Sequence, residues 1–161
     1  MKVISKQRNS KMCYICGMDN PVGLKAQFYN MEDDSVMTKF QYSLNHQSFP
    51  QRVHGGLIST MLDELAARAY WVKDENIIGA TLSMEVKFRR PVRYDEYVLG
   101  KGIVISDSSK FFTSDVQILD LEGNVLANAI VKYIKLPPEK ISDANYHEEM
   151  CYLLEDDVTE L

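Results

Sequence analysis

Apolar residues recur with two different periods along this chain, and the change of period predicts its elements. Within residues 56–73 they return every three or four positions, which is typical of a helix with one buried face. Residues 36–43 and 80–89 alternate between apolar and polar side chains, which is typical of strands. Further strands are expected at residues 26–30, 97–106, 111–120 and 125–136, and a short helix at about 146–154. Turn residues around Gly123 predict a hairpin between the last two strands.

One long apolar helix among five or six strands predicts an α+β fold, in which a curved antiparallel sheet wraps around that helix. Residues 1–24 are polar and contain Asn20-Pro21 and Gly23, so we expect an irregular entry segment there. Residues 25–136 form the expected domain, and residues 137–161 an acidic C-terminal extension.

Charge is distributed unevenly around a net value of −5. Residues 137–161 hold eight acids and one lysine (−7), so residues 1–136 carry +2 from 17 bases and 15 acids. We expect the extension to be solvated. The sequence has no basic stripe interleaved with aromatic residues, the pattern that would suggest nucleic-acid binding. No run reaches the ~18–20 apolar residues of a membrane span and no signal-peptide core is present, so we expect a cytoplasmic protein that binds no membrane.

His54-Gly55-Gly56 opens the long helix, and Asp63 lies two turns inside it. Glycines let a ligand approach the backbone, and the first N–H groups of a helix can bind a carbonyl or an anion. Asp63 has no cationic residue one turn away, whereas Glu64 has Arg68 four residues on. Glu64 is therefore expected in a solvated ion pair, and Asp63 is the candidate for chemistry.

These residues resemble the hotdog-fold acyl-CoA thioesterases, specifically the group related to phenylacetyl-CoA thioesterase. The resemblance covers residues 13–136. It includes the strand sequence of residues 80–90 followed by Pro91-Val92, and an entry segment that begins Cys13-Tyr14-Ile15-Cys16-Gly17. It implies a hydrolase that acts as a homodimer or a dimer of dimers (homotetramer), with active sites at the protomer interface.

The resemblance also implies roles for individual residues. Asp63 would be the general base or nucleophile, and the Gly56 N–H would polarise the thioester carbonyl. Thr81 would reach over from the partner protomer; Ser83, two residues on and expected on the same strand face, is the less favoured choice. His54 would shape the loop and contact substrate, with Gly55, Ser59 and Ser83 as further substrate contacts. The chemistry agrees with this, because thioester hydrolysis needs a base and donors aimed at the oxyanion.

Coenzyme A enters as part of the substrate, and no other cofactor or metal is expected. Its phosphates need cations, which Arg89 and Arg90 offer near the end of the strand at residues 80–89, with Lys87 and Arg93 close by in the sequence. The alternative interpretation, a solvated strand end that binds no ligand, fits this cluster equally well.

Cys13 and Cys16 have the Cys-x-x-Cys spacing of zinc and redox sites. A structural zinc site needs four ligands, and the sequence shows no second pair; nor is there a βαβ unit to suggest a thioredoxin-type motif. The two thiols are therefore expected to pack the entry segment.

Two other functions stay open. A hotdog acyl-thioester dehydratase or hydratase would have His-Phe-Pro where Ser48-Phe49-Pro50 stands here, and its helix acid would lie one residue away from Asp63. A non-catalytic acyl-CoA-binding protein would need the pocket but not Asp63. The sequence does not identify the acyl group.

Overall fold

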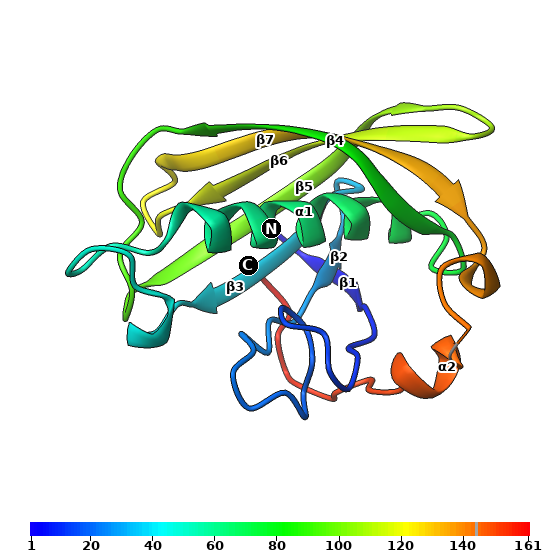
Figure 1. Cartoon of the computed structure of the whole chain (residues 1–161), viewed down its shortest axis with the longest axis horizontal. Coiled ribbons are helices and arrows are strands. Elements are labelled where there is room, and N and C mark those ends of the chain that lie inside the picture. Colours follow the sequence, from blue (N-terminus) through cyan, green and yellow to red (C-terminus); the bar gives the residue numbers. More distant parts are fainter. Residues whose placement is uncertain (144) are drawn as a thin grey trace.

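A seven-stranded antiparallel sheet curves around one long helix in the computed structural model, which describes residues 1–143 and 145–161 (Figure 1). The strands are β1 (Val3–Lys6), β2 (Tyr29–Met31), β3 (Val36–Gln41), β4 (Ile78–Phe88), β5 (Tyr97–Asp107), β6 (Phe111–Leu119) and β7 (Val125–Leu136). The helices are α1 (Gly55–Trp71) and the short α2 (Tyr146–Glu149), with 3-10 turns at Leu44–His46 and Pro138–Lys140. The predicted hotdog architecture is confirmed, with a sheet larger than the five or six strands expected.

Helix α1 lies in the concave face of the sheet because its apolar stripe has nowhere else to be buried. Met61, Leu62 and Leu65 are fully buried. The helix approaches β5 so closely that a Cβ at Gly102 would lie 3.1 Å from the carbonyl oxygen of Leu65. Burying a leucine side chain contributes about 2 kcal/mol, so this stripe fixes which side of α1 faces the sheet. No helix of the described chain is long and apolar enough to cross a membrane.

Strand β4 is an edge strand, since the order across the sheet is β1-β2-β3-β5-β6-β7-β4. Its register against β7 is interrupted between Thr81 and Ser83 by a β-bulge. Leu82, Met84 and Phe88 are exposed on this strand at 53%, 36% and 56%. An edge with free backbone groups and large exposed apolar side chains is a surface on which another strand can pair.

The sequence predicted an irregular entry segment, but part of this segment forms a strand. Its residues Val3–Lys6 form β1, which pairs with β2 and extends the sheet. Four residues are too few to give a clear period, and β1 exists because β2 offers it an edge.

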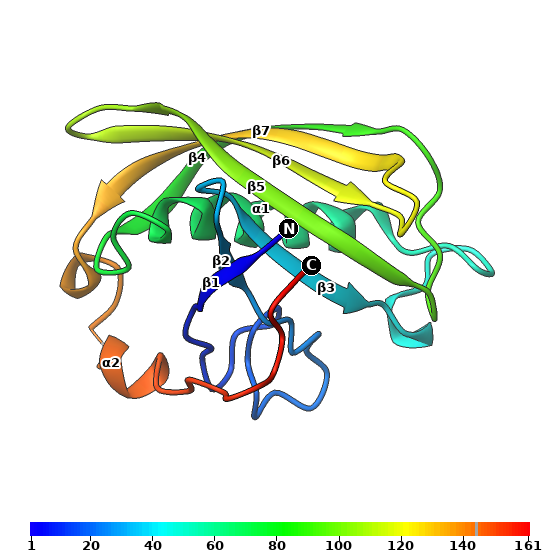
Figure 2. The ribbon, with the colours of Figure 1, turned by 180° about the vertical axis from the view of Figure 1, so that it is seen from behind.

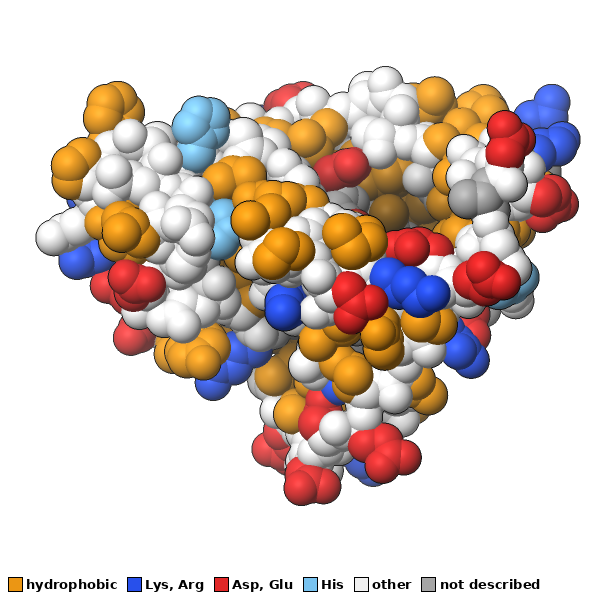
Figure 3. Space-filling model, turned by 60° about the horizontal axis from the view of Figure 1, so that its bottom comes forward, with side chains coloured by type: hydrophobic (Ala, Val, Ile, Leu, Met, Phe, Trp, Pro, Cys, Tyr) orange, Lys and Arg blue, Asp and Glu red, His pale blue; other side chains and the backbone are white. Residues whose placement is uncertain are grey.

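The acidic extension returns to the N-terminus rather than projecting into solvent. Figure 2 shows its last residues running beside β1, where the Val3 N–H donates to the Thr159 carbonyl at 2.8 Å. Lys6 pairs with Asp156, and Asn9 bridges to Tyr152. One face of the molecule is hollowed, with hydrophobic side chains on the floor of the hollow and acidic ones at its edge (Figure 3). The negative charge of the extension is therefore partly neutralised by the N-terminal segment.

Candidate active site

Asp63 is held by two hydroxyl groups on the inner side of the sheet. The Thr81 hydroxyl donates to Asp63 Oδ1 at 2.9 Å, and the Tyr133 hydroxyl donates to the same oxygen at 2.9 Å. Tyr133 OH also lies 2.7 Å from the Asp63 backbone carbonyl. Within residues 1–143 and 145–161 no hydrogen bond reaches Oδ2. One carboxylate oxygen is fixed, and the other is left for a substrate or a water molecule.

Tyr133 is a site residue that the sequence analysis missed. It is fully buried, and burial together with the charge and hydrogen bond of Asp63 raises its pKa, which favours the protonated, donating form. A signal was present in the sequence. Ala127, Ala129 and Val131 form the core face of β7, and Tyr133 is the next position on that face with a polar tip. A buried tyrosine hydroxyl needs a partner.

The β-bulge on β4 separates Thr81 from Ser83. Thr81 pairs with Tyr133, on the core side of β7, whereas Ser83 pairs with the exposed Lys132. Side chains of directly paired residues lie on the same face, so Ser83 points away from Asp63. The prediction that Thr81 and Ser83 share a face is wrong because the alternation of side chains shifts by one at the bulge.

Thr81 also reaches Asp63 within its own chain. The 2.9 Å contact between Thr81 Oγ1 and Asp63 Oδ1 shows that this carboxylate can be oriented without a residue from a partner, and the expected role of Thr81 across protomers stays a prediction. Strand β4 lies directly beside α1, and this brings the two residues together although 18 positions separate them.

The N-terminus of α1 is capped by His54. Its Nδ1 accepts the Gly56 N–H at 2.9 Å, so the donor that the sequence assigned to a thioester carbonyl is already engaged. A capping side chain satisfies one of the first N–H groups of a helix, which explains this difference. In the described chain, the Gly55 N–H has no acceptor. The Ser59 hydroxyl donates to the Gly55 carbonyl at 2.9 Å, on the next turn of the helix.

A groove of about 350 Å³ opens beside this helix end. Gly55 and Phe88 line it together with Arg52, Arg89 and Arg90. The structure thus brings both predicted arginines to the helix start and adds Arg52. None of these three arginines forms an ion pair with an acid of the described residues. Cations and a helix N-terminus around one groove favour an anionic ligand.

Lys87 and Arg93, the other bases of the predicted cluster, are already paired. Lys87 contacts Glu85 at 3.0 Å, and Arg93 contacts Glu96 at 3.0 Å. They are therefore less available to an anion than Arg90.

Glu64 forms the expected ion pair with Arg68, at 2.7 Å, but the Arg68 side of this pair is buried. The Arg68 side chain is only 2% exposed, and its guanidinium packs over Phe28 and Trp71. Burial acts to lower the pKa of Arg68, but Glu64 and Cys16 raise it, so the guanidinium stays charged. The sequence prediction was wrong because the entry segment covers this side of α1.

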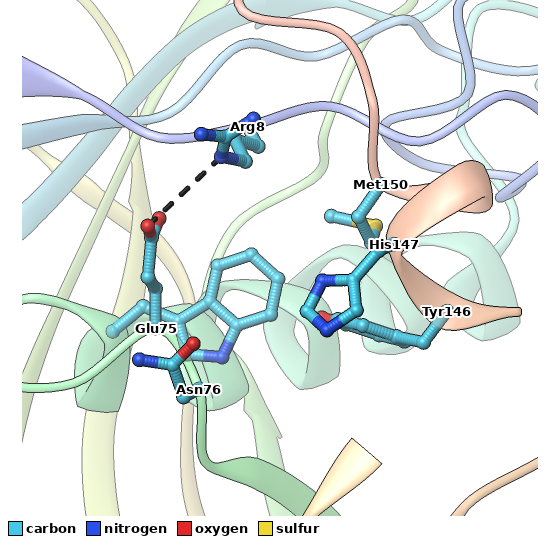
Figure 4. A pocket seen from close by; sticks show the side chains of 7 residues that line it. Arg8, Glu75, Asn76, Tyr146, His147 and Met150 are labelled. Atoms are coloured by element: carbon cyan, nitrogen blue, oxygen red, sulfur yellow. Dashed lines mark ion pairs between the residues drawn. The ribbon is translucent and has the colours of Figure 1, made fainter. Parts of the chain in front are cut away.

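A second cavity, of about 290 Å³, lies between the C-terminal end of α1 and α2 (Figure 4). Trp71, Tyr146 and His147 contribute to its wall, and Arg8 faces Glu75 across it at 3.9 Å. Of the described residues that line it, none belongs to the predicted site.

Residues 51–127 match the sequence model of the thioesterase superfamily. These 77 residues are just under half of the chain, and over them the chain is similar to that superfamily. The match includes the start of α1, Asp63 and Thr81, whereas Tyr133 lies beyond it. The narrower group suggested by the sequence, that of phenylacetyl-CoA thioesterase, stays a prediction.

Two curated relatives are acyl-coenzyme A thioesterases. The acyl-coenzyme A thioesterase THEM4 of Rattus norvegicus is 29% identical over 117 residues, which are 71% of this chain and 49% of the relative. THEM4 of Mus musculus is 27% identical with the same coverage. The chain spans about half the length of the curated relatives it matches.

Solved structures share the hotdog fold of this chain. The thioesterase superfamily protein RHA08564 has a TM-score of 0.70 and 21% identity, covering 74% of this chain and 58% of that one. A hypothetical thioesterase protein from Streptococcus pneumoniae TIGR4, solved with coenzyme A, has a TM-score of 0.63 and 18% identity, with coverage of 70% and 89%.

Proposed function

We propose that this protein hydrolyses an acyl-CoA thioester to a free acid and coenzyme A. The observation that carries the proposal is the fixed Asp63 carboxylate, with Oδ1 held by two hydroxyls and Oδ2 free of hydrogen bonds in the described chain. A base held in one orientation near an open edge of the sheet is placed to accept a proton from water. The THEM4 relatives and the family support the thioester as substrate.

The reaction then needs no redox partner. Asp63 Oδ2 takes a proton from water as the water oxygen bonds to the thioester carbon, and the carbonyl oxygen becomes an oxyanion. The C–S bond breaks as this intermediate collapses, and the departing thiolate recovers the proton. Asp63 acting instead as a nucleophile would form an anhydride that water opens, with the same products.

The oxyanion donor is the Gly55 N–H, because His54 holds that of Gly56. Gly55 and Asp63 are eight residues apart, which places them roughly 12 Å apart along the axis of α1. One thioester carbonyl needs both groups within about 3 Å of its reacting atoms. The donor and the base of one site must therefore come from two protomers.

Pairing of β4 with β4 of a second copy satisfies this requirement. Helix α1 and β4 lie side by side, with Gly55 near Phe88 and Asp63 near Thr81. A twofold axis near Ser59 would make the two copies of α1 antiparallel and bring Gly55 of each opposite Asp63 of the other. It would also cover the exposed apolar side chains of β4. We therefore propose a homodimer as the active unit, and its further pairing into a tetramer stays an expectation.

The groove at the start of α1 is the proposed binding site of the coenzyme A phosphates. Arg52, Arg89 and Arg90 supply the positive charge, and none forms an ion pair with an acid among the described residues. Guanidinium groups fit phosphate oxygens through paired N–H donors. The structure of the Streptococcus pneumoniae protein with coenzyme A supports this ligand class.

Release of free thiol from short, medium, long and aromatic acyl-CoAs tests the proposal. Asp63→Asn keeps the shape of the side chain and should reduce turnover by at least ~100-fold, the usual contribution of a general base. Glu122→Gln, an exposed acid in the β6–β7 hairpin, serves as the matched control and should leave the rate unchanged. Binding of acyl-CoA without thiol release by the native protein would contradict the proposal and favour a binding protein.

A further inference from the structure

Two thiols and a carboxylate meet where the entry segment crosses α1. The sulfur atoms of Cys13 and Cys16 and a carboxylate oxygen of Glu64 all lie within 4.8 Å of one another. Cys13 Sγ is 3.7 Å from Glu64 Oε2. Figures 1 and 2 both place the entry segment against the helix on the side away from most of the sheet. The third group was invisible in the sequence because 48 residues separate it from Cys16.

We propose that Cys13, Cys16 and Glu64 bind one Zn²⁺ ion. Thiolate sulfur and carboxylate oxygen are both common zinc ligands, and three protein ligands leave a fourth position for water. Glu64 is 23% exposed, so water can reach that position. Binding deprotonates both thiols and releases two protons, with no change of oxidation state.

The backbone around the two cysteines is already shaped as a ligand loop. The Gly17 N–H donates to the Cys13 carbonyl at 2.8 Å, and the Ile15 N–H donates to Cys13 Sγ at 3.4 Å. A Cβ at Gly17 would lie 2.3 Å from the Cys13 carbonyl oxygen, so only glycine fits this tight turn. Ser10 Oγ lies 3.5 Å from Cys16 Sγ. N–H and O–H groups beside the sulfurs stabilise and orient thiolate ligands.

The charges of the cluster also balance when zinc is present. Two thiolates, one carboxylate and Zn²⁺ sum to −1, and the buried guanidinium of Arg68 supplies +1 beside Glu64. Arg68 Nη2 has no hydrogen-bond partner in the described chain although it is buried. A buried charge needs such compensation, and an anionic metal cluster would provide it.

The proposed ion would fasten the entry segment to α1. It lies on a different face of the helix from Asp63, since successive helical residues are turned by about 100°. The ion therefore takes no part in the proposed hydrolysis.

The test uses the full chain, stripped of metal under reducing conditions and titrated with Zn²⁺ or Co²⁺. We expect one metal ion per chain, with the thiolate-to-cobalt absorption and strong visible bands of tetrahedral Co²⁺. Zinc should raise the melting temperature of the native protein, and a chelator should reverse the rise. This readout needs no variant and so does not depend on whether a variant folds.

Variants then assign the ligands. Cys16→Ser should abolish the thiolate–cobalt absorption, and Glu64→Gln should weaken zinc affinity by more than ~100-fold, beyond the usual loss for an outer-sphere partner. Cys151→Ser, which removes the exposed third cysteine, is the matched control and should bind metal normally. The proposal is overturned if the reduced native protein binds no stoichiometric zinc, or if Cys151→Ser loses binding as Cys16→Ser does.

Discussion

Tyr133→Phe removes one hydroxyl group from the proposed active site and little else. The ring of Tyr133 stacks on Phe112 with centroids 4.7 Å apart, and this contact survives in the variant. The lost hydroxyl donates to the Asp63 carboxylate and lies against the Asp63 backbone carbonyl, at 2.9 and 2.7 Å. The variant therefore tests how Asp63 is positioned, without removing the carboxylate.

The size of the effect follows from the charge and burial of these groups. A hydrogen bond to a charged acceptor contributes about 1.5–3 kcal/mol, so we expect the free energy of unfolding to fall by about 2 kcal/mol. For a chain of this length that corresponds to a lower melting temperature by roughly 4–8 °C. Because one of the two donors that orient Asp63 is lost, kcat should fall on the order of 10-fold. KM should change little, because Tyr133 is fully buried.

Denaturant unfolding and thiol-release kinetics measure the two effects. Tyr42→Phe is the matched control, because Tyr42 is also fully buried but its hydroxyl makes only a long 3.4 Å contact with the Leu57 carbonyl. We expect it to cost less than about 1 kcal/mol and to leave kcat unchanged. The reasoning is refuted if Tyr133→Phe unfolds and turns over like the native protein, or if Tyr42→Phe loses as much kcat.

Two further predictions concern charge. Arg90→Ala should raise KM for acyl-CoA about 5-fold, since an exposed phosphate contact contributes up to about 1 kcal/mol, and added salt should shrink the effect. The control is Arg93→Ala, which should leave KM unchanged because the Arg93 guanidinium already pairs with Glu96. Equal effects in the two variants would contradict the assignment of the groove to phosphate binding. The second prediction concerns Asp33. Its burial acts to raise the pKa of the carboxyl group, but hydrogen bonds from Lys101 and Ser35 outweigh this and lower the pKa of Asp33 to about 2. The stabilising contribution of ionised Asp33 should be present above about pH 3.8 and lost as pH falls toward 2. In Asp33→Asn, the free energy of unfolding should therefore depend less on pH over that window than it does in the native protein. An unchanged pH dependence would refute the assignment.

The local pattern of the sequence determined the main elements. The 3.6-residue period predicted α1 to within about two residues at each end, and alternation predicted β3 and β4 to within about two residues. The further strands expected after them match β5, β6 and β7 nearly to their observed bounds. These segments are long, and each has one buried face. β1 escaped prediction because four residues with mixed burial carry no period of their own.

The sequence also singled out Asp63 as the helix acid without a cationic neighbour, and the turn into α1 as a ligand-facing backbone. Those inferences needed only positions on one helix. Tyr133 is different, because it reaches Asp63 from 70 residues away and only the packing of β7 against α1 joins them.

Tertiary structure decided the details that depend on neighbouring strands and segments. The bulge on β4 turned Thr81 toward Asp63 and Ser83 away from it, because pairing with β7 shifts the alternation at one point. The entry segment converted Glu64 and Arg68 from an expected surface pair into a buried one, and brought Cys13 and Cys16 to the same carboxylate. Periodicity records which face of an element is buried, whereas the identity of the groups that meet there is set by contacts between residues distant in the sequence.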